Sequence, residues 1–436
     1  MRPKTLATLA MATALLLFSP ASWTQMSTPP LIANSADELV ALTLDNALAL
    51  AESANPALRF KRAELAAAEG LQDDAAAWLN RNPEVSLAKT RRQVPVAAAG
   101  SDRYREWDTG ISQTLEIAGQ RGHRLDAAEA ATAALRGEIA DAQRQMRAEV
   151  GERFYHVLAL QQRVDIESRA STLFDTTAGA IQKRRSAGED TRLDANVASV
   201  EAERARNQLA VAQEQLLEAR SELAARLQLP PLKLPRAVGD LAANSSGYTL
   251  NDLLTTAEAQ PRVRALAERE NSADARLKLE RASRYPDITV GASVGREGPQ
   301  TGRERLTTFS ISLPLPLFKR NQAGVGQATT ELQQAQIERQ TNLRDTRANI
   351  SALWMKLNSL DARVRRLQES VLPALDDNQT LSLKSQRAGQ IGLLEMIVVN
   401  RQALDARRDL IDALTEYHAT RVALELAAGW PQEGTK

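Results

Sequence analysis

The chain has 436 residues, and its 55 lysines and arginines against 54 aspartates and glutamates leave a net charge of +1, so no overall field selects a nucleic-acid partner. Cysteine is absent, which excludes disulfides, thiolate metal sites and acylation of an N-terminal cysteine. Aromatic residues are only 4% of the chain, and the abundant Ala, Leu, Gln, Glu and Arg favour long, partly solvated helices over a large globular core.

The N-terminus has the layout of an export signal. Arg2 and Lys4 precede an apolar run at residues 6–18, and Ala21 offers a small residue for cleavage. The run has about 13 residues whereas a membrane-spanning helix needs roughly 20, so we expect residues 1–21 to be a signal peptide rather than an anchor. No later segment approaches a spanning helix, and membrane residence would therefore have to come from strands.

Two long stretches of the chain, residues 43–230 and 249–430, match each other along their length. For example, Ala187 and Gly188 in the first stretch correspond to Ala388 and Gly389 in the second. Neither copy has a core large enough to close by itself, so the duplication points to an assembly built by symmetry. We expect the remaining residues to be a flexible N-terminal segment at 22–42, a linker at 231–248 and a C-terminal tail at 431–436.

The first repeat is predicted to begin with two helices and a strand pair. A short helix over residues 44–55 ends before Pro56, because the residue that precedes a proline is disfavoured in the helical conformation. An Ala-rich helix follows over residues 57–80. Two strand candidates come next, at residues 84–89 and 106–115, joined by a polar loop that contains glycine.

The second repeat contains a clearer strand pair, at residues 287–295 and 306–315, in which apolar side chains alternate with small or polar ones. Segments of about ten residues with this alternation fit an outer-membrane barrel, whose outside meets lipid and whose inside meets water. The alternative is a soluble hairpin that lies on the helices. Four strands cannot close a barrel within one chain, so oligomerisation would have to supply the rest. The residues assigned to the lipid face are Ile288, Val290, Val294, Phe309, Ile311 and Leu313.

Each strand pair is followed by a predicted helix of unusual length. Residues 122–187 and 322–388 each carry the helical pattern over roughly 65 residues, on the order of 100 Å, and Pro373 is the only proline within them. Leu and Val recur at three- and four-residue intervals, for example at Leu193 and Val197, which provides a seam for coiled-coil packing. The other faces carry Arg, Gln and Glu and are expected to be solvated.

The segments that close the two strand pairs are the most distinctive motifs of the chain. The first reads Gln-Thr-Leu-Glu-Ile-Ala-Gly-Gln-Arg over residues 113–121, and the second reads Leu-Pro-Leu-Pro-Leu-Phe-Lys-Arg-Asn-Gln-Ala-Gly over residues 313–324. Both resemble the TolC-like outer membrane factors, and more narrowly the branch that serves heavy-metal efflux pumps of the cobalt-zinc-cadmium and nickel type. The resemblance extends over about residues 40–430 and includes the duplication and both Ala-Gly pairs.

The resemblance implies an α+β, mostly α fold. In it, a trimeric outer-membrane β-barrel with four strands per chain continues into a long α-helical coiled-coil tunnel in the periplasm. The implied partners are two further copies of the chain, a periplasmic adaptor protein, an inner-membrane resistance-nodulation-division (RND) transporter and outer-membrane lipid. The implied function is the outer-membrane exit duct of a tripartite RND efflux system that exports heavy-metal cations from a Gram-negative cell. Some members carry a lipid anchor on an N-terminal cysteine, which this sequence lacks.

The resemblance also assigns roles to the two Ala-Gly pairs, which are expected to be periplasmic tips that dock the adaptor. Glycine supplies the positive φ that other residues resist where one helix reverses into the next. Asp194 and Glu395 occupy matching positions just after the tips and are gate candidates, and in a trimer they would place a ring of carboxylates around the tunnel. The alternative is that both are helix-start acids favoured by the helix dipole. The candidate docking residues are Arg184, Arg185, Ala187, Gly188, Arg387, Ala388 and Gly389.

No catalytic, cofactor or resident metal site is predicted. His123, His156 and His418 are scattered, and none has a partner at metal-ligand spacing on its own helix. No nucleotide fingerprint or Ser/His/Asp set stands out, so we expect neither a cofactor nor an enzyme. Two alternatives to metal efflux remain. One is an outer-membrane factor for drugs or other small molecules, and the other is a secreted periplasmic coiled-coil scaffold whose hairpins never enter lipid.

Overall fold

The computed structural model describes residues 39–96, 100–231, 233–243, 247–299 and 302–430. The predicted signal peptide, the rest of the chain before Leu39 and the tail at 431–436 lie outside these residues. The first half contains β1 (Val40–Leu42), α1 (Leu44–Ala54), α2 (Pro56–Ala76), β2 (Glu84–Val96), β3 (Gly100–Leu115), α3 (Gln120–Ser186), α4 (Arg192–Arg226) and β4 (Pro235–Ala237). The second half contains α5 (Leu250–Glu258), α6 (Pro261–Ala282), β5 (Ile288–Glu297), β6 (Glu304–Ser312), α7 (Gln322–Arg366), the π-helical segment η1 (Leu367–Val371), α8 (Leu372–Arg387) and α9 (Leu393–Ala428).

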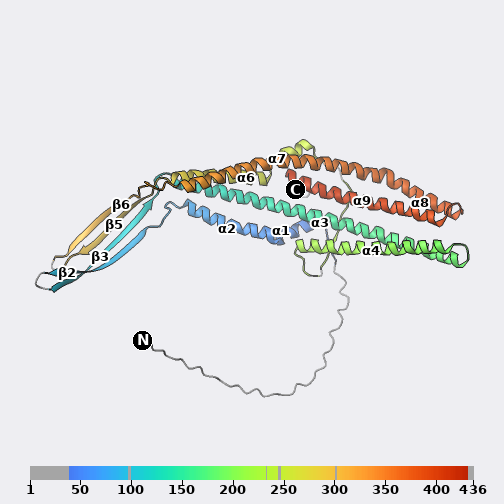
Figure 1. Ribbon diagram of the computed structural model, residues 1–436, viewed down its shortest axis with the longest axis horizontal. Helices are drawn as coiled ribbons and strands as arrows, with labels where there is room; N and C mark the ends of the chain where they lie inside the picture. Colours follow the sequence, from blue (N-terminus) through green and yellow to red (C-terminus); the bar gives the residue numbers. More distant parts are fainter. Residues whose placement is uncertain (1–38, 97–99, 232, 244–246, 300–301, 431–436) are drawn as a thin grey trace, which may run out of the picture. The chain divides into compact units, whose positions relative to one another are not determined.

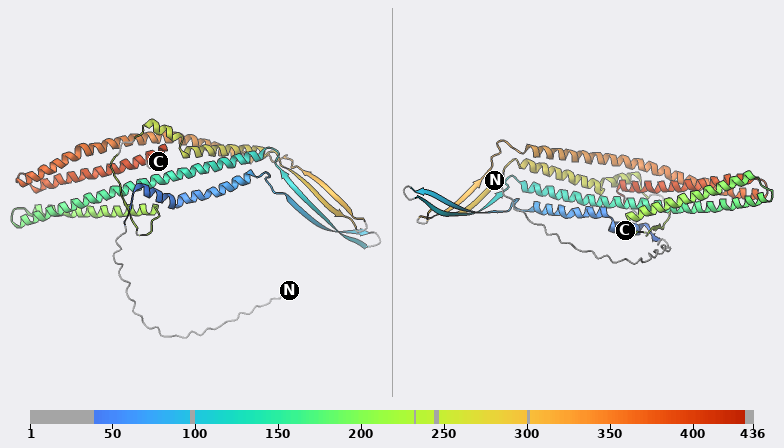
Figure 2. Two further views of the ribbon diagram at one scale, coloured as in Figure 1. Left: turned by 180° about the vertical axis from the view of Figure 1, so that it is seen from behind. Right: turned by 60° about the horizontal axis from the view of Figure 1, so that its bottom comes forward.

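The same order of elements occurs in both halves. Each half contains two short helices, then an antiparallel strand pair, then a long helical hairpin (Figure 1). The two strand pairs join one sheet, and α3 packs along α4, α6 and α9, so the halves are also joined through their helices. Figure 2 shows these long helices side by side in two further views.

Local sequence signals explain where the short helices break. Asn55 is extended, with a ψ of 119°, before Pro56. The Asn55 side chain accepts hydrogen bonds from the backbone N–H groups of Ala57 (2.9 Å) and Leu58 (3.2 Å), so one residue ends α1 and caps α2. Pro261 begins α6 in the equivalent place, where a missing N–H has no cost.

The strands form one antiparallel sheet in the order β2-β3-β5-β6, so the two repeats meet at the β3–β5 pair. The first hairpin is longer than predicted, since β2 continues to Val96 and β3 begins at Gly100. Its outer part carries charged residues from Lys89 onward, and the apolar alternation used to predict strands therefore stops too early.

The last strand is shorter than predicted. β6 ends at Ser312, two residues before Pro314, which has no N–H to give to a ladder. Leu313, predicted to lie on the strand, therefore follows it.

The second long helix is interrupted, whereas an unbroken helix over residues 322–388 was predicted. α7 passes into η1, and α8 resumes at Leu372, directly before Pro373. Proline lacks the N–H for the i→i−4 bond and its ring collides with the preceding turn, and a wider π turn accommodates both effects. α3 has no proline and runs unbroken for 67 residues.

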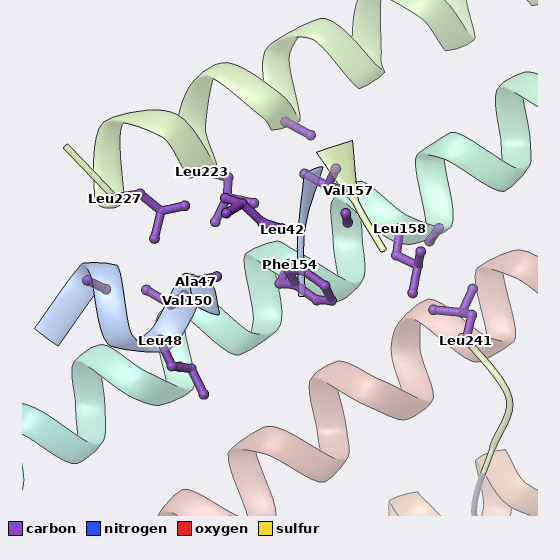
Figure 3. Close-up of a cluster of buried hydrophobic side chains, with 14 of the residues drawn as sticks. Leu42, Ala47, Leu48, Val150, Phe154, Val157, Leu158, Leu223, Leu227 and Leu241 are labelled. Carbon is purple, nitrogen blue, oxygen red and sulfur yellow. The ribbon is translucent and has the colours of Figure 1, made fainter. Parts of the chain in front are cut away.

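An apolar core lies where β1 and β4 pair in parallel against α1, α3 and α4 (Figure 3). Leu42 of β1 is buried there with Phe154 of α3 and Leu223 of α4. Both strands lie within the predicted flexible segment and linker, because strands of three residues are too short to show an alternating pattern. Among the helices that the structure describes, none combines the length and the apolar composition needed to cross a membrane.

Candidate functional site

The cross-strand register gives the sheet one apolar face. Val290 pairs with Ile311, and Ala292 pairs with Phe309, so their side chains share one side of the sheet. Phe309 and Ile311 are 81% and 79% exposed, which leaves this face available to an apolar surrounding. Five of the six predicted lipid-facing residues lie on it, and Leu313 lies beyond β6. The apolar residues of this face are Val85, Leu87, Ile111, Leu115, Ile288, Val290, Ala292, Val294, Phe309 and Ile311.

The opposite, polar face carries small and acidic side chains. Thr114 Oγ1 and Thr289 Oγ1 lie 3.0 Å apart on it. A Cβ added to Gly110 would lie 2.9 Å from Ser86 Oγ, so glycine permits the close approach of side chains on this face. The charges of this face were not predicted from sequence, although the alternation of residues along longer strands indicates them. The acidic residues of the polar face are Glu84, Asp102, Glu106, Asp108, Glu297 and Glu304, and the one cation on its described strands is Arg92.

Both long helical hairpins reverse at the predicted Ala-Gly pairs. Gly188 and Gly389 have positive φ values of 82° and 70°. The N–H of Glu189 donates to the carbonyl of Arg184 (2.9 Å), which completes a Schellman motif, and the second turn has the equivalent bond. A Cβ at either glycine would meet no atom within 4 Å, so the backbone conformation rather than crowding requires glycine.

The charges beside the two turns differ. Arg184 Nε pairs with Glu189 Oε2 (3.4 Å) and Asp190 Oδ2 (3.2 Å). Arg185 is exposed and donates to Gln182 (3.4 Å). Arg387, beside the second turn, is exposed and forms no ion pair with any residue that the structure describes. The charge of Arg184 beside the first turn is therefore balanced by carboxylates, whereas that of Arg387 beside the second turn is not balanced within the described residues.

The two gate candidates lie in the first turns of α4 and α9. Asp194 belongs to a capping box, because the Thr191 N–H donates to its Oδ2 (3.2 Å) and its own N–H donates to Thr191 Oγ1 (3.2 Å). Glu395 is exposed, and the residue that precedes its helix, Gly392, provides no side-chain cap. A Cβ added to Gly392 would lie 2.6 Å from Glu395 Oε2, so this carboxylate folds over the helix start. A ring of such carboxylates would require further copies of the chain.

Each helical hairpin is closed by an ion pair at an equivalent position. Arg206 Nη2 lies 2.8 Å from Asp175 Oδ1 in the first hairpin, and Arg407 Nη2 lies 2.7 Å from Asp376 Oδ1 in the second. The partners are 31 residues apart in both cases. An alignment of the two repeats against each other would have found this pair.

A buried carboxylate, that of Glu167, joins the two repeats through an ion pair between α3 and α9. Glu167 of α3 has a side chain only 1% exposed. Its Oε1 accepts hydrogen bonds from Arg408 Nε of α9 (2.8 Å) and from Arg163 Nε (2.9 Å). The bond to Glu167 raises the pKa of Arg408. No sequence signal pointed to this clamp, since Glu167 and Arg408 are 241 residues apart.

The structure offers no cluster for a resident metal within its described residues, where no three His, Asp or Glu side chains could hold one ion. His418 is buried, with Nε2 3.0 Å from the carbonyl oxygen of Leu241 and its ring stacked on Tyr155 at 4.1 Å. Burial lowers the pKa of His418, so the ring is neutral at ordinary pH. It packs between the two repeats.

Comparisons with known proteins agree with this architecture. A family model described as outer membrane efflux protein matches residues 47–227 and 255–430. The cobalt-zinc-cadmium resistance protein CzcC of Cupriavidus metallidurans is 26% identical over 388 residues, which cover 89% of this chain and 90% of CzcC. The nickel-cobalt-cadmium resistance protein NccC of Alcaligenes xylosoxydans xylosoxydans is 24% identical over 343 residues, which cover 74% and 69%. The crystal structure of CusC has a similar fold, with a TM-score of 0.73 at 17% identity over 94% of this chain and 98% of that one.

Proposed function

This chain belongs to the outer membrane efflux protein family, and we propose that it is the exit duct of a tripartite RND pump that exports heavy-metal cations. Family membership assigns it to efflux at the outer membrane of a Gram-negative cell rather than to catalysis. In the proposed assembly, three copies close one barrel and their long helices form the tunnel. A periplasmic adaptor docks at the Gly188 and Gly389 turns and connects the tunnel to the inner-membrane transporter.

The two-faced sheet carries this proposal. In an outer-membrane barrel the apolar side chains face lipid and the polar ones face water. Within the described chain, β2 and β6 each pair on one side only, so the sheet has two open edges. Unpaired backbone groups are not tolerated in hydrocarbon. Pairing β2 of one copy with β6 of the next around a threefold axis satisfies both edges.

The acidic residues of the polar face support a cationic cargo. Arg92 Nη2 pairs with Glu106 Oε2 (3.2 Å), and the other carboxylates of this face form no ion pair in the part of the chain that the structure describes. Carboxylates that line a water-filled passage attract cations and repel anions. The relatives CzcC and NccC are named for resistance to cobalt, zinc, cadmium and nickel, which points in the same direction.

Deletion of the gene tests the cargo directly. The deletion strain should lose resistance to one or more of nickel, cobalt, zinc and cadmium when each is given separately, and the wild-type gene should restore it. Sensitivity to organic drugs alone would replace metal export by drug export. Fractionation tests the location and the assembly, because a detergent-stable trimer is expected in the outer membrane. A soluble periplasmic protein would support the scaffold alternative instead.

A further inference from the structure

Charged residues of the sheet are sorted by face. Every acidic residue of the four described strands lies on the polar face, together with Arg92. All other cations of these strands lie on the apolar side, in the half of the sheet toward the strand turns and away from the helices, where the apolar residues end. These cations are Lys89, Arg91, Arg103, Arg105, Arg296 and Arg305, which we call the basic band.

One line of paired residues, made of three members of the basic band and Trp107, crosses all four strands. Lys89 pairs with Trp107, Trp107 pairs with Arg296, and Arg296 pairs with Arg305. The eight steps along β5 from Ile288 to Arg296 span about 27 Å along the strand, which is roughly 21 Å of barrel height at a strand tilt of about 40°. The lipid-facing band of an outer-membrane barrel is about 25 Å tall and is bordered by aromatic residues. In the proposed barrel, Trp107 and its basic neighbours therefore lie at the outer border of the lipid-facing band, next to the lipid headgroups.

The basic band has no counter-charge within the described chain. All six side chains are exposed, and none forms an ion pair there. Arg91 stands directly opposite Arg105, and Arg296 stands directly opposite Arg305. Like charges in directly opposed positions destabilise a sheet. An external anion between these arginines would remove the repulsion.

We propose that the basic band binds the phosphate groups of phosphorylated glycolipids in the outer leaflet. The inference rests on the proposed function, because it needs the apolar face of the sheet to lie in the membrane. The anion is a lipid headgroup rather than free phosphate, since the band continues directly into the apolar face that would contact the acyl chains. Paired guanidinium groups suit this ligand because they bind phosphate oxygens in a bidentate way.

The test uses the full-length protein in neutral detergent micelles, with lipid A as the probe. The thermal midpoint is measured with phosphorylated lipid A, with dephosphorylated lipid A and with inorganic phosphate. Only phosphorylated lipid A should raise it, and added salt should weaken the effect. An equal rise with inorganic phosphate would replace the lipid by a free anion. An equal rise with dephosphorylated lipid A would show that the apolar face alone binds, and the proposal would fail.

Two matched double variants locate the effect. Arg296→Gln with Arg305→Gln should weaken the apparent affinity for phosphorylated lipid A roughly 30-fold, from about 1 kcal/mol per cation. Arg363→Gln with Arg366→Gln removes the same charge from an exposed part of α7 and should change nothing. Arg296→Lys with Arg305→Lys keeps the positive charges and should retain most of the binding. This result would show that the Gln variant loses affinity through its charge and not through misfolding.

The outcomes also separate this inference from the barrel itself. If the Gln variant binds phosphorylated lipid A as tightly as the wild type, the basic band is rejected. If the wild type inserts into neutral phosphatidylcholine bilayers, the barrel stands in spite of that rejection. If it inserts into no bilayer at all, both the barrel and the basic band fail.

Discussion

The two repeats share one order of elements but differ at the turns of their long helical hairpins, at Gly188 and Gly389. The first turn has a compensated Arg184 and leads into a helix that the Thr191 and Asp194 capping box stabilises. The second turn leads into α9, whose N-cap residue Gly392 provides no side-chain cap, and Arg387 beside the turn has no ion pair within the described residues. Behind the second turn lies η1, whereas α3 is unbroken.

The difference shows which part of a duplicated hairpin is fixed. The Asp175–Arg206 and Asp376–Arg407 pairs hold both hairpins in the same register, and the residues beyond them are where the repeats diverge. Fewer local contacts and a π turn lower the free energy of local opening. We therefore expect the second hairpin to be the more mobile one, and the following changes test that comparison.

The largest effect is expected where the repeats are clamped to each other. Glu167→Leu removes the buried carboxylate that Arg163 and Arg408 share, and breaking a buried pair in this way costs about 3 to 5 kcal/mol. The thermal midpoint of the purified protein should fall accordingly. Glu167→Leu with Arg408→Leu should recover part of the loss, since Arg408 no longer lacks its partner and Arg163 keeps its ion pair with Asp412. A double variant no more stable than the single one would contradict a charge-based clamp.

A cation placed on the apolar face of the sheet should reduce assembly equally in both repeats. Val85→Arg on β2 and Ile311→Arg on β6 each place a cation on the apolar face, which costs about 2 to 4 kcal/mol near the bilayer midplane. Both should reduce the amount of trimer recovered from outer membranes. Thr308→Arg, on the polar face of β6, is the matched control and should be tolerated. Equal harm from Thr308→Arg would reverse the assignment of the faces.

The family and the presence of a sheet were predictable from sequence because they rest on local patterns. Alternation at residues 287–295, the Ala-Gly pairs and the segments after each strand pair all lie within a few residues of each other. The outer half of the first hairpin was missed because charges replace the apolar alternation there. Its faces emerge only from the register, which is a relation between strands.

The contacts between repeats were not predictable in the same way. Glu167 meets Arg408 across 241 residues, and each side chain alone resembles a solvated helix charge. The π turn was also missed, although Pro373 marked its place, because a proline does not specify how the helix accommodates it. Asp194 and Glu395 looked equivalent by position, and only the caps distinguish them.

A pH effect is expected at the junction of the repeats, where His418 is buried near Arg421 and Asp240. Burial lowers the pKa of His418 below its ordinary value of 6.5. Below about pH 6.5 the unfolded chain binds a proton that the folded chain does not. The free energy of unfolding therefore decreases as the pH is lowered, by at most about 1.4 kcal/mol per pH unit. Thermal midpoints between about pH 7.5 and 5.5 should show this fall. His418→Gln should flatten it, and an unchanged slope would assign the fall to other groups.

The contrast between the caps of the two turns can be reversed by mutation. Thr191→Ala removes the capping box of α4 and should cost about 1 kcal/mol. Gly392→Ser should add a capping box with Glu395 to α9, because residue 392 has the extended conformation of a cap and only a flexible carboxylate must move. Hydrogen exchange near each turn should become faster in the first variant and slower in the second. If both turns already exchange equally fast in the wild type, the proposed difference in mobility is wrong.

The smallest effects are expected at the proposed gate, and the caps predict that its two carboxylates differ. Asp194 is engaged by Thr191, whereas Glu395 is exposed and accepts no such bond among the described residues. A ring of carboxylates in a constriction favours cations. In planar bilayers, Glu395→Ala should therefore lower the preference for cations more than Asp194→Ala does, and Asp194→Ala should mainly lower the thermal midpoint. Asp194→Asn separates the two roles, because its amide oxygen can still accept the bond from the Thr191 N–H while the charge is removed.

The double variant tests whether these residues also help to close the tip. Asp194→Ala with Glu395→Ala should weaken cation selectivity. It should also raise the single-channel conductance, since attraction between the carboxylates and bound cations can no longer hold the tip closed. Glu395→Asp keeps the charge and is the control for a loss of packing. Unchanged conductance and selectivity in the double variant would remove both residues from the gate. The duct would still stand, because its evidence lies in the sheet, and the two acids would then serve only to start their helices.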